Sequence, residues 1–238
     1  MRRFLLISSA ALALAAPLSA QVTVSSGAPS DHIGPLGKDA ISGTIPTAIA
    51  QTFVVPTGFD FLQSFTFFFT NYINGSALNL DASVYQFSGD HLVGPALFAS
   101  ALVSGTDSPS DEMLTFGNAA SPINLQLTPG TVYALVLSSL AGYALTPDGS
   151  AIQVGTTSTD TYAGGAFFVS LAQTQAELSA PGAFIGDVAP DAAFSARFTS
   201  AAVTATPEPG SLVLLGTGLV GVVGFARGRQ RPNPQLSS

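Results

Sequence analysis

The chain has 238 residues, with 14 acidic against seven basic side chains and no cysteine. The lack of cysteine excludes disulfides, thiolate metal sites and a cysteine nucleophile. Outside the two ends of the chain the only basic side chains are Lys38 and Arg197. The central part is therefore acidic, and we expect it to repel nucleic acid and anionic membrane surfaces.

The N-terminus has the three parts of a secretory signal peptide. Two arginines form a charged start, residues 4–16 are apolar, and Ala20 offers a small residue for cleavage, although Leu18 is larger than usual three positions before the cut. This pattern predicts a signal peptide over residues 1–20, cut before Gln21. The apolar run is too short to favour a retained membrane anchor.

The central part is expected to consist of strands. Residues 21–50 are rich in Gly, Pro and Ser, which predicts a leader loop with room for one edge strand. From residue 51 onward, short runs of β-branched and aromatic residues lie between turn residues. The expected strands are 51–55, 59–70, 78–87, 91–103 with a break at Gly94-Pro95, 123–127, 131–138, a short one near Ile152, 166–171 and 194–199.

The segments between these strands carry further expectations. Residues 104–118 are polar and predict a loop, and residues 172–178 predict a single helical turn or a loop. The strands 123–127 and 131–138 flank the turn signal Pro129-Gly130, so we expect them to pair as a hairpin.

Short strands with turn signals and almost no helix predict an all-β domain over residues 51–199. We expect an antiparallel two-sheet β-sandwich of jelly-roll type. Phe65, Phe67 and Phe69 fall on one face of their strand and Phe68 on the other. This alternation indicates that both faces of that strand are covered.

The histidines give little support to catalysis. His32 lies in the expected leader loop, and His91 follows a turn. A hydrolytic triad needs a histidine beside both a nucleophile and a carboxylate, and no serine lies in a G-x-S-x-G turn. We therefore expect that the protein is not an enzyme.

Acidic residues gather at two places that could hold a hard cation. Asp107, Asp111 and Glu112 lie in one polar stretch, and Asp187 and Asp191 form a second group. Ca²⁺ takes carboxylate and carbonyl oxygens from such loops, and a glycosidase needs two carboxylates. Because the D-x-D-x-D spacing of an EF-hand is absent, a solvated loop is the favoured interpretation, and we assign no metal and no cofactor.

Tyrosines are the aromatic side chains that could stack on a sugar, because the chain has no tryptophan. Tyr85 lies opposite the main apolar face of its strand, and Tyr133 shares a face with Leu135 and Leu137. Packing within the sheets is favoured over ligand stacking. The five candidates are Tyr72, Tyr85, Tyr133, Tyr143 and Tyr162.

The C-terminal part combines three elements in order. Residues 200–211 form a linker that contains Pro207, Glu208 and Pro209, and the two prolines keep this stretch extended. Residues 212–226 carry no charge and predict a transmembrane helix of about 22 Å, which is short for a bilayer. A basic cytoplasmic tail, residues 227–238, follows with Arg227, Arg229 and Arg231. Positive charge stays on the cytoplasmic side, so the domain is expected outside.

This order of Pro-Glu-Pro motif, apolar helix and arginine cluster closely resembles the PEP-CTERM sorting signal of exported bacterial proteins. The same signature is also called the ice-binding protein C-terminal domain, a label of the tail that implies no ice binding. The resemblance implies recognition in the inner membrane by an exosortase, which is thought to cut near the Pro-Glu-Pro motif. Thr206 stands where the family more often has valine. A plain C-terminal anchor is the alternative.

Together these features predict an exported bacterial surface or extracellular-matrix protein with a structural or adhesive domain. The alternative is a carbohydrate-binding module, with or without the help of Ca²⁺. The expected partners are an exosortase, the inner membrane and extracellular polysaccharide, and no nucleic acid.

Overall fold

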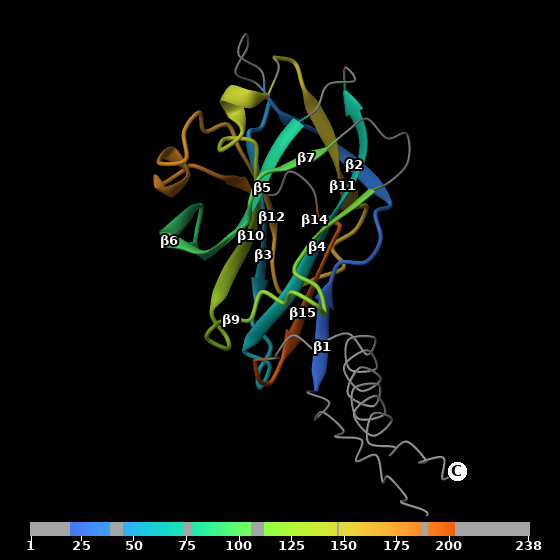
Figure 1. Cartoon of the computed structure of the whole chain (residues 1–238), viewed down its shortest axis with the longest axis vertical. Coiled ribbons are helices and arrows are strands. Elements are labelled where there is room, and N and C mark those ends of the chain that lie inside the picture. Colours follow the sequence, from blue (N-terminus) through green and yellow to red (C-terminus); the bar gives the residue numbers. More distant parts are fainter. Residues whose placement is uncertain are drawn as a thin grey trace, which may run out of the picture.

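The domain is built from two stacked antiparallel β-sheets (Figure 1). The computed structural model describes residues 20–38, 45–73, 78–105, 112–146, 148–186 and 190–202. Within these ranges the chain forms 15 strands and two short 3₁₀ helices, η1 (Tyr143–Leu145) and η2 (Glu177–Ser179). The expected two-sheet antiparallel sandwich is confirmed, while the finer jelly-roll connectivity stays a prediction.

The first sheet is centred on β4, which has a neighbouring strand on each edge. On one edge β15 pairs with its first half and β11 with its second half, and on the other edge lie β9 and β8. Strands β1 and β2 in turn pair with β15 and β11. The members are β1 (Gln21–Ser25), β2 (Asp31–Gly37), β4 (Phe61–Ile73), β8 (Glu112–Phe116), β9 (Leu125–Gln126), β11 (Ala151–Thr157), β14 (Asp191–Ala192) and β15 (Phe194–Thr199).

The second sheet has the order β13-β12-β3-β10-β5-β6, with β7 paired to β5. Its central strand β10 pairs with β3 on one side and β5 on the other. The members are β3 (Ala48–Val54), β5 (Leu78–Ser88), β6 (His91–Ala99), β7 (Val103–Gly105), β10 (Val132–Ser138), β12 (Phe167–Ser170) and β13 (Ile185–Gly186).

Aromatic side chains fill the space between the two sheets. Phe65, Phe67 and Phe69 point into this core as predicted, and all three are buried. The ring of Phe65 stacks on that of Phe116 with 5.0 Å between centroids. Phe68 lies on the opposite face and stays partly exposed. The expectation that both faces of this strand are covered is therefore wrong for the first sheet.

A second, smaller core lies on the outer face of the second sheet. The segment that includes η2 covers this face, with Leu178 and Phe184 buried against the sheet. Phe87 contacts Phe184 and also Phe168, whose ring centroid lies 4.9 Å away. Strand β3 is therefore buried on both faces, as its burial pattern shows.

The expected leader loop over residues 21–50 is wrong, because β1, β2 and the start of β3 lie there. Strand β2 includes the cis peptide Gly34-Pro35. A proline lacks the backbone donor and is tolerated on an edge strand. The Gly and Pro content therefore concealed two edge strands.

Three further expectations are corrected. The segment 104–118 contains β8, which pairs with β4. The predicted hairpin does not form, because β9 pairs with β4 whereas β10 pairs with β3 and β5. Gly94-Pro95 does not end its strand, since β6 continues to Ala99 with an irregular register against β5.

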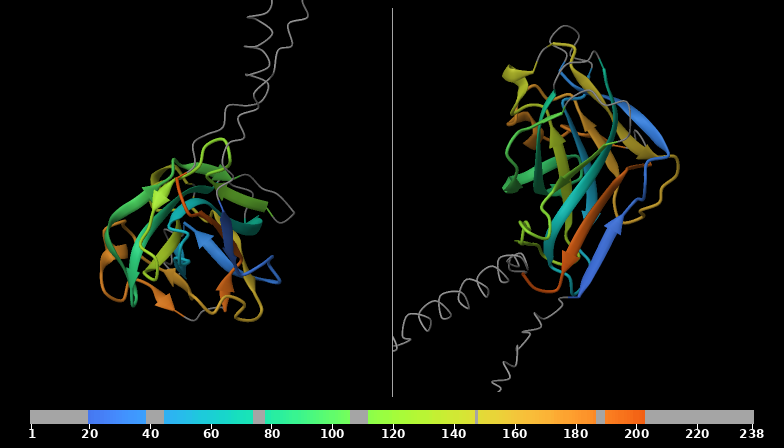
Figure 2. Two further views of the ribbon diagram at one scale, coloured as in Figure 1. Left: turned by 90° about the horizontal axis from the view of Figure 1, so that it is seen from below. Right: turned by 45° about the vertical axis from the view of Figure 1, so that its right-hand side comes forward.

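The chain enters and leaves the sandwich at one end of the molecule. Gln21, the first residue of β1, is paired with Thr199, the last residue of β15. The start of β1 and the end of β15 therefore lie side by side, at the lower end of Figure 1 (see also Figure 2). We call this end the exit pole. Among the residues that the structure describes, no helix has the length and apolar character needed to cross a membrane. The predicted signal peptide and the predicted transmembrane helix lie outside those residues, except for Ala20.

Candidate functional site

The acidic residues predicted from sequence do not form a described metal site. Asp107, Asp111 and Asp187 lie outside the described residues. Glu112 is the first residue of β8 and pairs with Phe69. Within the described ranges, no three His, Asp or Glu side chains come together as metal ligands would.

Asp191 is fully buried and connects the two sheets. Its Oδ1 accepts a hydrogen bond from Gln51 Nε2 of β3 at 3.1 Å. Its Oδ2 accepts from the backbone N–H groups of Thr161 at 3.1 Å and Tyr162 at 3.0 Å. Gln51 Oε1 in return accepts from Ala192 N at 2.7 Å. Burial raises the pKa of the Asp191 carboxyl, and these hydrogen bonds oppose that rise. Asp191 is therefore a structural carboxylate with protein donors on both oxygens.

The histidines lie on different sheets, His32 on β2 of the first and His91 on β6 of the second. His91 Nδ1 lies 3.1 Å from Asp90 Oδ1. This hydrogen bond lowers the pKa of the Asp90 carboxyl. The pair sits at the turn between β5 and β6.

The described tyrosine side chains are used in packing or in hydrogen bonds within the domain. Tyr133 is 6% exposed and its hydroxyl accepts from Thr128 N at 3.1 Å. Tyr85 belongs to the outer core, and its hydroxyl accepts from Gln175 Nε2 at 3.1 Å. The side chain of Tyr72 lies outside the described part.

The remaining two tyrosines also have partners in the domain. Tyr162 accepts from Val54 N at 3.1 Å, and its ring packs edge-on against Phe194. Lys38 Nζ lies 4.8 Å from the ring centroid of Tyr143 and 3.1 Å from Asp148 Oδ1. These contacts favour the packing interpretation of the tyrosines over sugar stacking.

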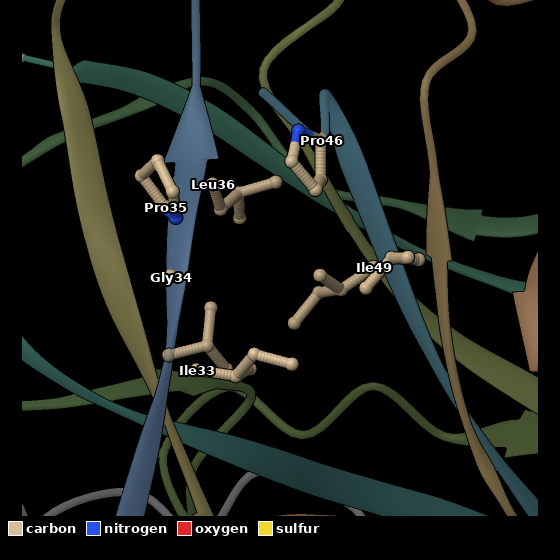
Figure 3. A pocket seen from close by; sticks show the side chains of 8 residues that line it. Ile33, Gly34, Pro35, Leu36, Pro46 and Ile49 are labelled. Carbon is tan, nitrogen blue, oxygen red and sulfur yellow. The ribbon is translucent and has the colours of Figure 1, made fainter. Parts of the chain in front are cut away.

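A small apolar cavity lies between β2 and β3 (Figure 3). It measures about 90 Å³, and its lining includes Ile33, Leu36 and Ile49. In Figure 3 the side chains of Ile33 and Ile49 face each other across it. Such a site is small and lacks the few convergent polar groups that orient a substrate. We interpret it as a packing gap between an edge strand and the opposite sheet.

The outer face of the first sheet carries rows of serine and threonine side chains that the sequence analysis did not predict. Ser25 pairs with Ser195, Ser195 with Thr66, and Thr66 with Thr115. These four residues form one row across four adjacent strands, and the hydroxyl oxygens of Thr66 and Thr115 lie 2.8 Å apart.

A second row lies beside the first on the same face. Arg197 pairs with Thr23 on one side and with Ser64 on the other. We call this surface the hydroxyl face; it consists of Thr23, Ser25, Ser64, Thr66, Thr115, Ser195 and Arg197. The alternation of Ser and Thr within single strands is visible in the sequence, but the rows depend on the register between strands.

The tail follows the last strand of this sheet closely. Seven residues, 200–206, separate Thr199 at the exit pole from the Pro-Glu-Pro motif, and seven residues can span no more than about 25 Å. Residues 205–230 match the family model for the PEP-CTERM protein-sorting motif. The chain carries a PEP-CTERM sorting signal. This signal marks an exported surface protein that is directed to an exosortase.

The comparisons with whole proteins add no further relative. No curated protein matches the PEP-CTERM chain, and no solved structure matches it. The family match covers the sorting signal and not the sandwich.

Proposed function

We propose that this PEP-CTERM protein is a non-enzymatic component of the cell surface or extracellular matrix, with a structural or adhesive sandwich domain. The observation that carries the proposal is the sorting signal, which follows the sandwich domain after a short linker. In the described part of that domain no three His, Asp or Glu side chains come together. Asp191 and the tyrosines with described side chains serve the fold. The hydroxyl face supplies an open surface for contacts.

The proposed route has three stages. A signal peptidase removes residues 1–20, the membrane segment holds the chain with the domain outside the cytoplasm, and an exosortase cuts near Pro207–Pro209. The processed domain is then released or transferred to the surface or matrix. A plain C-terminal anchor remains the alternative to processing.

A variant of the sorting motif in the native host tests this route. Pro207, Glu208 and Pro209 are all changed to Ala, and the intact mass and the cell fraction of the protein are measured. We expect the natural chain to begin near Gln21 and end near Pro209, whereas the variant keeps its apolar segment and stays in the membrane fraction.

The matched control changes Pro232 and Pro234 to Ala, because these prolines lie in the same tail but outside the motif. Its mass and distribution should equal those of the natural chain. If the motif variant and the natural chain have the same C-terminus and the same distribution, processing at the motif is rejected.

A carbohydrate-binding module is the second candidate function. The hydroxyl face favours it, since hydroxyl groups both donate and accept hydrogen bonds. The tyrosines with described side chains do not supply an aromatic platform. Titration with glycans, with and without Ca²⁺, separates this candidate from a purely structural role.

A further inference from the structure

Arg197 is a cation without an ion pair among the described residues, on an otherwise acidic domain. The other basic side chain of the domain, Lys38, donates to Thr146 O at 2.9 Å and pairs with Asp148. Arg197 has no side-chain hydrogen bond or ion pair within the described part of the chain, and its Nε is buried. Because the side chain is partly buried, it has less conformational freedom to lose on binding an anion than a fully exposed arginine would have.

The residues around Arg197 are uncharged. Thr23 and Ser64 flank it across the neighbouring strands, and Ser195 precedes it by two residues on the same face. None of the described outward positions on β1, β4, β8 and β15 is acidic. The hydroxyl face is therefore a carboxylate-free, singly positive area on a negative domain.

The spacing of the hydroxyl groups is regular. Neighbouring strands lie about 4.8 Å apart, so the row from Ser25 to Thr115 is about 14 Å long. The row of Arg197 lies two residues further along the strands, at a distance of about 6.7 Å. This array presents donors and acceptors at several points along an extended ligand.

We infer that the hydroxyl face binds an anionic polysaccharide, with the Arg197 guanidinium paired to a carboxylate of the sugar chain. A guanidinium binds carboxylates through two parallel N–H···O bonds. The serine and threonine hydroxyls hydrogen-bond to the neighbouring sugar hydroxyls. The inference rests on the adhesive role proposed above and names the class of ligand that this role requires.

Alginate, a polymer of uronic acids, is the probe, and neutral dextran is the comparison. The full chain is purified in a neutral detergent, and binding is measured by isothermal titration calorimetry. We expect alginate to bind more weakly as salt is raised, and dextran not to bind. Arg197→Gln should weaken alginate binding at least about tenfold, because a charged hydrogen bond is lost.

Two further variants keep the test decisive. Lys38→Gln removes the same charge away from the hydroxyl face and should leave the affinity unchanged. Thr115→Val keeps a β-branched side chain on β8, removes one hydroxyl of the row, and should weaken binding several-fold. Far-UV circular dichroism confirms that each variant is folded.

Several results would overturn the inference. These are the absence of alginate binding, unchanged binding by folded Arg197→Gln, or equal losses in Arg197→Gln and Lys38→Gln. A change in oligomeric state in Arg197→Gln without alginate binding would make the face a contact between copies. Binding of glycerol phosphate in place of alginate would make it a lipid-headgroup site. None of these results depends on processing of the tail, so the sorting route is tested separately.

Discussion

Removal of the Asp191 side chain should destabilise the domain strongly. Asp191→Ala leaves the N–H groups of Thr161 and Tyr162 without their acceptor. It also removes one of the two acceptors of Gln51 Nε2, which still donates to Thr52 O. Each unpaired buried donor costs about 1–3 kcal/mol, and relief of the buried charge offsets part of this. We expect a net loss of about 3 kcal/mol in the free energy of unfolding.

The assay is thermal unfolding of the full chain in a neutral detergent, followed by far-UV circular dichroism. A loss of about 3 kcal/mol lowers the Tm by roughly 6–12 °C for a domain of this size. Asp160→Ala is the matched control, because Asp160 is exposed and its charge raises the pKa of Asp191. It should leave the Tm unchanged or slightly higher. Equal Tm values for the two variants would refute the role of Asp191 in joining the sheets.

Two further predictions concern pH and packing. Burial raises the pKa of Asp81 and of Asp191, so their stabilising contribution is fully present below the unfolded value near 3.9 and is lost as pH rises through the folded value. The Tm should therefore fall as pH rises from about 4, the unfolded value, through the folded values. Asp81→Asn should reduce this fall more than Asp160→Asn, and an equal reduction in both would contradict the assignment. Phe67→Ala should cost about 3–5 kcal/mol because the side chain is fully buried, whereas the partly exposed Phe68→Ala should cost less than half of that in the same unfolding assay. Similar costs at the two positions would show that the two faces of β4 are equally covered.

The parts of the fold that could be predicted are those with a strong local pattern. The period-two alternation of Phe65, Phe67 and Phe69 gave the right strand and the right buried face. Strand β8 was not predicted because Glu112 shares the face of Leu114 and Phe116 whereas the apolar Met113 lies on the exposed face, so the apolar alternation is broken. Strand β9 was placed in the wrong pair because its partner β4 is far away in sequence.

In the candidate site, too, local sequence patterns could be predicted and contacts between distant residues could not. The sorting motif consists of contiguous residues, so it could be recognised from the sequence. Asp191 was grouped with Asp187 as a cation ligand, because no local signal links it to Gln51 on the opposite sheet. The hydroxyl face depends on pairs such as Ser195 with Thr66, which only the strand register brings together.

The pairing of β1 with β15 also sets the order in which the domain can be completed during export. The chain is exported from its N-terminus, so Gln21 emerges first and its partner Thr199 emerges last. The edge of the first sheet must wait for almost the whole domain, and such distant pairings form slowly. We expect β1 to remain unpaired until the end of the domain, next to the sorting signal, arrives. Completion of the first sheet and arrival of the sorting signal are therefore expected to come close together in time.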